Sequence, residues 1–104
     1  MHTEISSRRE ALVALCRRYG VERLEVFGSA ARGDDFDAQR SDVDFLVTFS
    51  AASRNDFGAL LDLEDGLQAL LGRRVDLVER EAIEQSRNYI RRRAILAEAE
   101  PIYG

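Results

Sequence analysis

Three aspartates stand where carboxylates could carry out chemistry. Asp42 and Asp44 are two residues apart at the start of an apolar run, and Asp76 lies inside a second apolar run, residues 75–78. Residues i and i+2 of a strand point to the same side, so the first two carboxylates share one face of a sheet. Like charges held this close repel each other unless a cation lies between them. If the two runs form neighbouring strands, the three carboxylates make a site for a hard cation such as Mg²⁺.

A glycine and a serine form a possible anion site earlier in the chain. Gly28 follows a strand-like run, and residues 29–32 can begin a short helix. A glycine lets the backbone bend and lets a phosphate approach closely. The free N–H groups at a helix start carry positive partial charge, and the hydroxyl of Ser29 adds a donor. This turn is therefore a candidate binding site for a triphosphate.

Each of these features also has a purely structural explanation. A glycine–serine pair after a strand can be only a turn, and an Asp-x-Asp pair can be only the solvated start of a strand. Asp76 can pair with Arg73, Arg74 or another arginine. The three features occur together, in an order that can bring triphosphate and metal within reach of each other. This combination favours the functional interpretation.

Hydrophobic periodicity predicts the elements that position these residues. We expect an αβαβαβα order, in which helices cover a three-stranded sheet that the tail after Pro101 can extend. A capping box that runs from Ser7 to Glu10 begins the first helix, Asn55 caps the third, and Gly72 ends it. The expected elements are a helix over 7–19, a strand over 21–27, a short helix over 29–32, a strand over 43–49, a helix between 55 and 72, a strand over 74–78 and a helix over 80–98.

The same periodicity predicts which side chains are buried. Leu24 and Val26 alternate with polar residues that include Glu25, so their strand has one apolar and one polar side. Cys16 falls on the apolar stripe of the first helix and is the single cysteine of the chain. We expect it to be buried and chemically inert.

Composition and charge limit the class of protein. The 104 residues are 45% hydrophobic and 33% charged, which predicts a single soluble domain over residues 1–104, in the cytoplasm. No apolar run approaches the ~20 residues of a membrane span. The net charge of −4 argues against direct binding to nucleic acid. One basic and partly apolar stretch fits either contact with a partner or ordinary helix packing; it contains Ile90, Arg91 and Ile95.

Three segments resemble the DNA polymerase β-like nucleotidyltransferase superfamily. They are residues 26–33 (Val-Phe-Gly-Ser-Ala-Ala-Arg-Gly), 41–47 (Ser-Asp-Val-Asp-Phe-Leu-Val) and 75–78 (Val-Asp-Leu-Val). Within the superfamily the chain resembles the minimal nucleotidyltransferase (MNT) antitoxins. The resemblance implies an α+β fold of the polymerase β-like palm type, with a small mixed sheet packed by helices.

The resemblance also implies roles for individual residues. Two Mg²⁺ ions would bind Asp42 and Asp44, while Asp76 would complete the first ion site and help to activate the attacking hydroxyl. The phosphates of ATP would bind at the turn, on Gly28, Ser29 and Arg32. The first two of these would hold the β- and γ-phosphates, and the arginine would either contact phosphate or structure the loop.

MNT proteins are antitoxins paired with HEPN-domain toxins, and some transfer AMP from ATP to a tyrosine of the toxin. The resemblance therefore implies a protein adenylyltransferase that forms a hetero-oligomer with a HEPN toxin. The short chain favours a protein acceptor, because few residues remain for a domain that binds a second substrate. Two other functions stay open: an antitoxin that neutralises its toxin by binding alone, and a nucleotidyltransferase for a small molecule such as an aminoglycoside.

Overall fold

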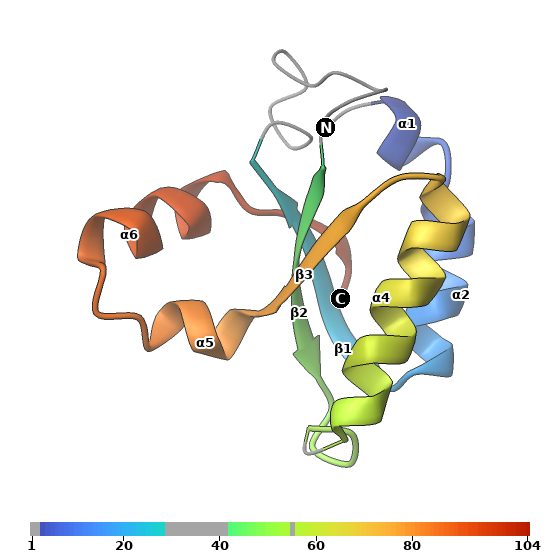
Figure 1. The fold of residues 1–104 in the computed structure, drawn as a ribbon, viewed down its shortest axis with the longest axis horizontal. Coiled ribbons are helices and arrows are strands. Elements are labelled where there is room, and N and C mark those ends of the chain that lie inside the picture. Colours follow the sequence, from blue (N-terminus) through green and yellow to red (C-terminus); the bar gives the residue numbers. More distant parts are fainter. Residues whose placement is uncertain (1–2, 29–41, 55) are drawn as a thin grey trace.

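Four strands form one mixed β-sheet with helices on both faces (Figure 1). This computed structural model describes residues 3–28, 42–54 and 56–104, and for residues 3, 4 and 57 it describes the backbone alone. None of the helices in these ranges is long and apolar enough to cross a membrane. The elements are α1 (Thr3–Ser6), α2 (Arg9–Arg18), β1 (Val21–Phe27), β2 (Val43–Phe49), α4 (Phe57–Leu71), β3 (Val75–Glu79), α5 (Arg80–Glu84), α6 (Tyr89–Glu98) and β4 (Glu100–Tyr103).

The strands lie in the order β3-β2-β1-β4. Strand β1 runs antiparallel to both β2 and β4, whereas β2 and β3 are parallel. The tail after Pro101 thus adds a fourth strand beside β1, as the sequence allowed. The predicted adjacency of the second and third strands is confirmed, and this adjacency determines the position of Asp76.

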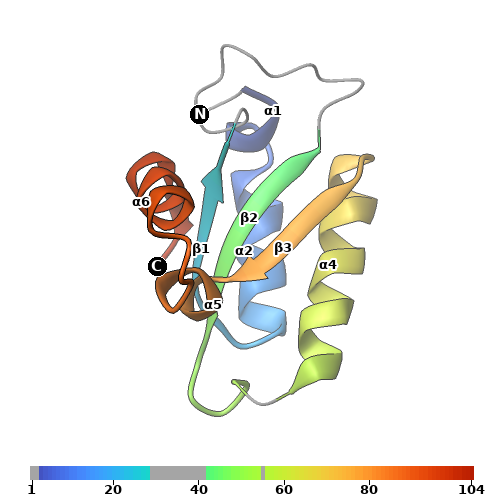
Figure 2. The ribbon, with the colours of Figure 1, turned by 60° about the vertical axis from the view of Figure 1, so that its left-hand side comes forward.

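Each face of the sheet packs against its own pair of helices. Helices α2 and α4 cover one face, and α5 and α6 cover the other (Figure 2). The larger core lies under α2 and α4 and includes Cys16, whose burial raises the pKa of its thiol to about 11, as expected for an inert cysteine. The smaller core lies under α5 and α6 and contains Phe27, Leu46, Ile83 and Ile95.

The predicted helix starts were partly wrong. The cap of helix α2 is Arg8, which makes no side-chain capping hydrogen bond, and not the predicted Ser7. Asn55 lies outside the described residues, and the cap of α4 is Asp56, whose Oδ1 accepts a hydrogen bond from the backbone N–H of Ala59 at 3.1 Å. Gly72 ends α4 with a left-handed φ of 66°, as predicted. The short helix predicted over 29–32 also lies outside the described residues.

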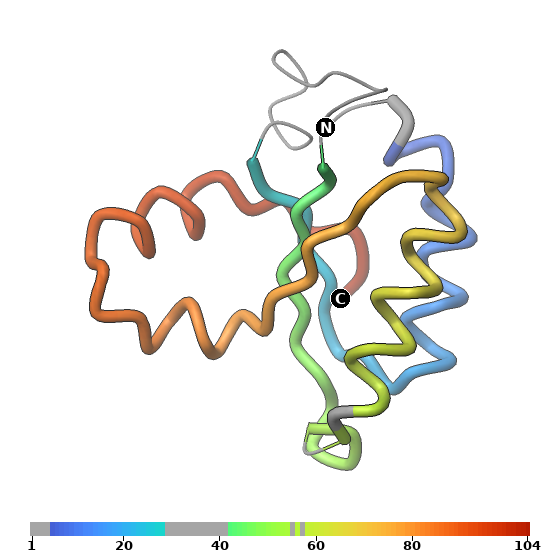
Figure 3. The backbone as a smooth tube through the Cα atoms, viewed as in Figure 1, coloured from blue at the N-terminus to red at the C-terminus, as the bar shows by residue number. Residues whose placement is uncertain are grey.

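The predicted helix over 80–98 is wrong, because two helices occupy this range. Figure 3 traces the backbone away from the sheet along α5 and back along α6. The turn between them has a polar cause: Ser86 Oγ accepts a hydrogen bond from the N–H of Asn88 at 3.2 Å, and Asn88 Oδ1 accepts one from the N–H of Arg91 at 3.1 Å. Asn88 is therefore the cap of a new helix. Apolar periodicity alone does not detect such a cap.

Candidate active site

Asp44 and Asp76 lie side by side on neighbouring strands. They are direct partners in the parallel register of β2 and β3. Val43 and Phe45, the neighbours of Asp44 in sequence, are fully buried under α2 and α4, so Asp44 points to the opposite face. Alternation along the two strands thus places both carboxylates on the face that α5 and α6 partly cover. The sequence prediction of a shared acidic face is confirmed for this pair.

The end of β1 brings Gly28 against the same carboxylate. Phe27 pairs with Asp44 in the antiparallel register of β1 and β2. Gly28 follows with a φ of +73°, a conformation that favours glycine. A Cβ at this position would lie 2.8 Å from Asp44 Oδ2. The backbone conformation therefore favours glycine at the turn, and any larger side chain there would displace the Asp44 carboxylate.

Burial and repulsion between carboxylates both disfavour the charged form of Asp44. Burial, followed by the nearby charges of Asp76 and Asp42, raises the pKa of Asp44 from its ordinary value of 3.8 to about 6. Asp44 is half-buried, whereas Asp42 and Asp76 are exposed. In the described part of the chain, no basic residue forms an ion pair with any of the three. A cation bound here would relieve the repulsion.

The carboxylates match the ligand chemistry of magnesium but do not form a closed metal centre. Mg²⁺ takes oxygen ligands, commonly one or two carboxylates together with water and substrate phosphate. Across the described residues, no three His, Cys, Asp or Glu side chains are close enough to hold an ion by themselves. The fit is thus to an open edge, where Asp42, Asp44 and Asp76 would supply only part of the coordination shell of a bound ion.

Asp76 lies at the centre of an apolar strand without being buried. Its side chain is exposed between the buried Val75 and Leu77, so it carries no burial penalty. Ser29 and Arg32 lie outside the described residues, and their predicted contacts with phosphate stay predictions.

Sequence reasoning missed a buried ion pair on the same face of the sheet. Glu25, expected on a polar side, is only 2% exposed. Both of its oxygens accept hydrogen bonds from Arg80 Nη1, at 2.6 and 2.7 Å, and Arg23 Nε lies 3.4 Å from Oε1. The pairing raises the pKa of the Arg80 guanidinium. The sequence contained only a weak signal for this pair. Arg80 directly follows an apolar strand, at the alternate position that shares a face with Asp76 and Val78.

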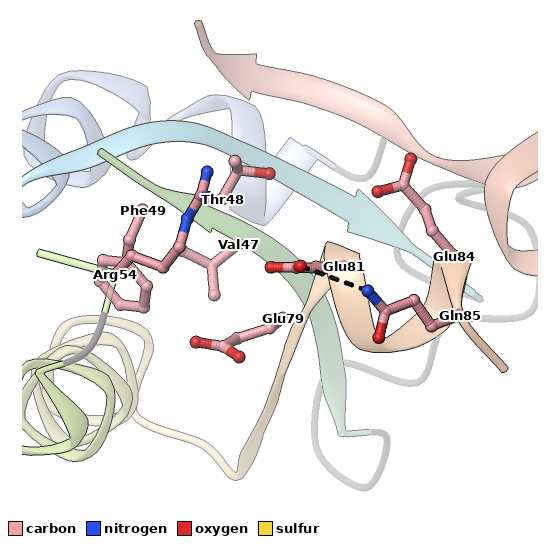
Figure 4. Close-up of a pocket in the computed structure, with 8 residues that line it drawn as sticks. All are labelled: Val47, Thr48, Phe49, Arg54, Glu79, Glu81, Glu84 and Gln85. Atoms are coloured by element: carbon pink, nitrogen blue, oxygen red, sulfur yellow. Dashed lines mark hydrogen bonds between the residues drawn. The ribbon is translucent and has the colours of Figure 1, made fainter. Parts of the chain in front are cut away.

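A cavity of about 350 Å³ lies at the other end of β2, away from Asp44 (Figure 4). Its lining includes Thr48, Arg54 and Glu79, together with Glu81 and Gln85, which are joined by a 3.3 Å hydrogen bond. None of the predicted site residues lines it. The candidate active site is therefore the carboxylate edge, where the predicted site residues lie, and not this cavity.

Comparison with known proteins places the chain in a family. The model of the nucleotidyltransferase domain family matches residues 8–97. The protein adenylyltransferase MntA of Thermococcus cleftensis is 41% identical over 70 residues, which cover 67% of this chain and 67% of the relative. A proposed protein adenylyltransferase of Methanocaldococcus jannaschii is 35% identical over 66 residues, covering 64% of each. The chain thus spans about two thirds of the length of these curated relatives.

Solved structures agree with this placement. A proposed minimal nucleotidyltransferase has a TM-score of 0.74 and 37% identity to this chain, and the match covers 97% of this chain and 96% of that one. A toxin–antitoxin complex with AMP-PNP contains a chain of the same fold, with a TM-score of 0.66 and 21% identity, covering 92% of this chain and 73% of that one. The predicted α+β nucleotidyltransferase fold is confirmed. The chain belongs to the nucleotidyltransferase domain family, and within it to the minimal nucleotidyltransferases.

Proposed function

We propose that this protein is a Mg²⁺-dependent protein adenylyltransferase and the antitoxin of a HEPN toxin, in which it modifies a tyrosine. The observation that carries the proposal is the pairing of Asp44 with Asp76, directly against the Gly28 turn, at one edge of the sheet. An acidic site for metal and a turn suited to phosphate are the two parts that nucleotidyl transfer needs. The use of ATP also suits a cytoplasmic location.

The residues at this edge divide the work of the reaction. Asp42, Asp44 and Asp76 would hold two Mg²⁺ ions, which neutralise charge on the triphosphate oxygens. Gly28 and Ser29 would bind the β- and γ-phosphates, and Arg32 would either contact phosphate or structure the loop. The Gly28 backbone can approach a ligand closely, because it carries no side chain and already has the φ that the turn requires.

The proposed transfer is a single displacement at the α-phosphorus of ATP. The phenolic oxygen of the acceptor tyrosine forms a bond to this phosphorus, and the bond from the phosphorus to the oxygen that bridges to the β-phosphate breaks. Pyrophosphate leaves and AMP remains on the tyrosine. Asp76 helps to remove the phenolic proton, which passes on to water.

The choice of a protein acceptor rests on relatives and on the open form of the site. Relatives of this chain are named as protein adenylyltransferases. One solved neighbour, at 19% identity, is a complex of an MNT antitoxin with a tri-AMPylated HEPN toxin from Shewanella oneidensis. Asp42 and Asp76 are exposed at the edge of the sheet. A bound partner is therefore needed to cover the acceptor and exclude water.

The test uses ATP labelled at the α-phosphate, MgCl₂ and the HEPN-domain toxin that the proposal places in an adjacent gene. We expect label on a toxin tyrosine with the wild-type chain, and a loss of about 100-fold or more with Asp42→Asn/Asp44→Asn. The matched control is Asp62→Asn/Asp65→Asn, which makes the same change of charge at exposed positions on α4, across the sheet from the site.

Three outcomes would contradict the proposal. Equal labelling by wild type and Asp42→Asn/Asp44→Asn would remove the carboxylates from the mechanism. Full neutralisation of the toxin by this variant, without transfer of label, would show an antitoxin that acts by binding alone. Label on an aminoglycoside and none on protein would show a small-molecule enzyme.

A further inference from the structure

The outer end of the α5–α6 hairpin carries a surface that the proposed reaction does not use. We call residues 87–93 the α6 tip. The tip lies at the turn farthest from the sheet, where α5 ends and α6 begins (Figures 1 and 3). Its start is fixed by the Asn88 cap and by a hydrogen bond from Arg92 Nη1 to the carbonyl of Ser86 at 3.1 Å. The tip is therefore an ordered surface.

Two large hydrophobic side chains are exposed on the tip. Ile90 is 79% exposed and Tyr89 is 56% exposed. Farther along the same helix, Ile95 is buried in the smaller core. The sequence left open whether this stretch contacts a partner or only packs as a helix. The structure divides the two roles along α6: Ile95 packs inside the protein, and Ile90 is free for a contact with another molecule.

The tip is also the most basic short segment of the described chain. Residues 87–93 include four arginines and no acidic residue, in a chain whose net charge is −4. Arg92 lies over the ring of Tyr89 at 5.6 Å, and Arg93 Nη1 donates a hydrogen bond to the Tyr89 hydroxyl at 3.1 Å. Tyr89 is thus held in place before any partner arrives, which lowers the entropy cost of binding. Aromatic and arginine side chains are the residues most enriched among strong contacts at protein interfaces.

Helix α6 connects the tip to the candidate active site. Its later residues pack with Ile95 against Phe27, which precedes Gly28 and pairs with Asp44. Ten helical residues span only ~15 Å. A folded protein seated on the tip could therefore also reach the carboxylate edge.

We infer that the α6 tip is the docking surface for the toxin, through an acidic face with an apolar hollow that receives Ile90. This inference rests on the proposed function. Charge selects the partner: a basic tip on an acidic chain attracts an acidic surface and repels a basic one. A protein fits better than nucleic acid, because Ile90 needs an apolar contact and the adjacent α5 exposes Glu81 and Glu84.

The test measures the Kd of the full-length chain for the HEPN toxin by titration calorimetry. We expect Ile90→Ser/Arg91→Glu/Arg93→Glu to weaken binding by about 30-fold or more. The control is Arg17→Glu/Arg18→Glu, which reverses the charge of an exposed pair at the end of α2. This control should bind the toxin as tightly as the wild type does. Hydrogen exchange on the wild-type complex gives a second readout that needs no variant, and it should show protection of residues 87–93.

The outcomes separate this inference from the proposed function. Unchanged binding by the tip variant, with no protection of residues 87–93, overturns the docking surface and leaves the adenylyltransferase proposal standing. Binding through the tip without AMP transfer supports the surface and overturns the catalytic proposal. Failure of the wild type to bind the toxin overturns both. If the tip variant loses only binding to a single-stranded RNA, or only self-association, the tip serves nucleic acid or a second copy instead.

Discussion

Two acidic sites lie on the same face of the sheet, and their surroundings differ. One acid is paired with an arginine, and the other is surrounded by further acids. Glu25 is almost fully buried, yet both of its oxygens are bonded to Arg80. Asp44 is only half-buried, yet burial together with the charges of its neighbours Asp76 and Asp42 raises its pKa to about 6. One carboxylate has a cationic partner within the chain. The other has more acid around it, and no arginine in the described residues pairs with it.

The contrast separates a structural charge from one that we propose to be functional. The buried carboxylate of Glu25, under α5 and α6, is neutralised by an arginine. The chain can therefore supply a positive partner for an acid on this face. At the Gly28 turn it gathers three acids instead. Repulsion of this kind destabilises the free protein, and binding of a cation offsets it. The acidic group that has no ion-pair partner among the described residues is therefore the one expected to bind a ligand.

The largest effect on stability is expected from breaking the structural pair. Glu25→Ala would remove the buried partner of the Arg80 guanidinium, whose side chain is 24% exposed and which would keep only the exposed Glu84, 3.5 Å away. We expect a loss of about 2–4 kcal/mol in the free energy of unfolding, measured by urea denaturation. Glu22→Ala, an exposed position on the same strand, is the control and should lose little. A loss no larger than that of the control would show that the pair is not structural.

A smaller effect of opposite sign is expected at the acidic edge. Asp44→Asn removes one repelling charge and should raise the free energy of unfolding at pH 7.5, without metal, by on the order of 1 kcal/mol, allowing for partial solvent screening. Asp62→Asn is the control for loss of an exposed acid.

The pH dependence of this gain has a defined sign. The pKa of Asp44 is raised in the folded state, so protonation there stabilises the wild type below pH 3.8, and this stabilisation is lost as the pH rises towards 6. The advantage of Asp44→Asn should therefore be full above pH 7 and vanish below about pH 4, in a series of denaturation curves. A gain that does not change with pH, or a loss of stability at pH 7.5, would contradict the account of repulsion.

The sequence was sufficient to predict the part of the site that depends on alternation. Val43 and Phe45 had to be buried, which sent Asp42 and Asp44 to the other face, and parallel pairing with β3 then placed Asp76 beside Asp44. Alternation was misleading at Glu25, because a charged residue can be buried when a partner comes from another element. That partner, Arg80, is 55 residues away, a separation at which local pattern carries no information.

The helical layer on the active-site face was the least predictable part. A single amphipathic helix and a helical hairpin bury similar apolar residues, here Ile83 and Ile95, and only the hydrogen bonds of Ser86 and Asn88 decide between them. The α6 tip follows from this turn, since a continuous helix would not present Tyr89 and Ile90 at a free end. The interpretation of this segment therefore depended on the structure.

Binding of Mg²⁺ and nucleotide to the acidic edge tests the central claim most directly. Thermal unfolding should be followed with MgCl₂ and a non-hydrolysable ATP analogue, for wild type, Asp44→Asn/Asp76→Asn and the Asp62→Asn/Asp65→Asn control. Ligand at about 100 times its Kd stabilises the folded state by about 2.7 kcal/mol, so the Tm of wild type and control should rise by several degrees. The Asp44→Asn/Asp76→Asn variant should start from a higher Tm and gain nothing. An equal rise for this variant, or no rise for the wild type, would contradict the assignment of the site.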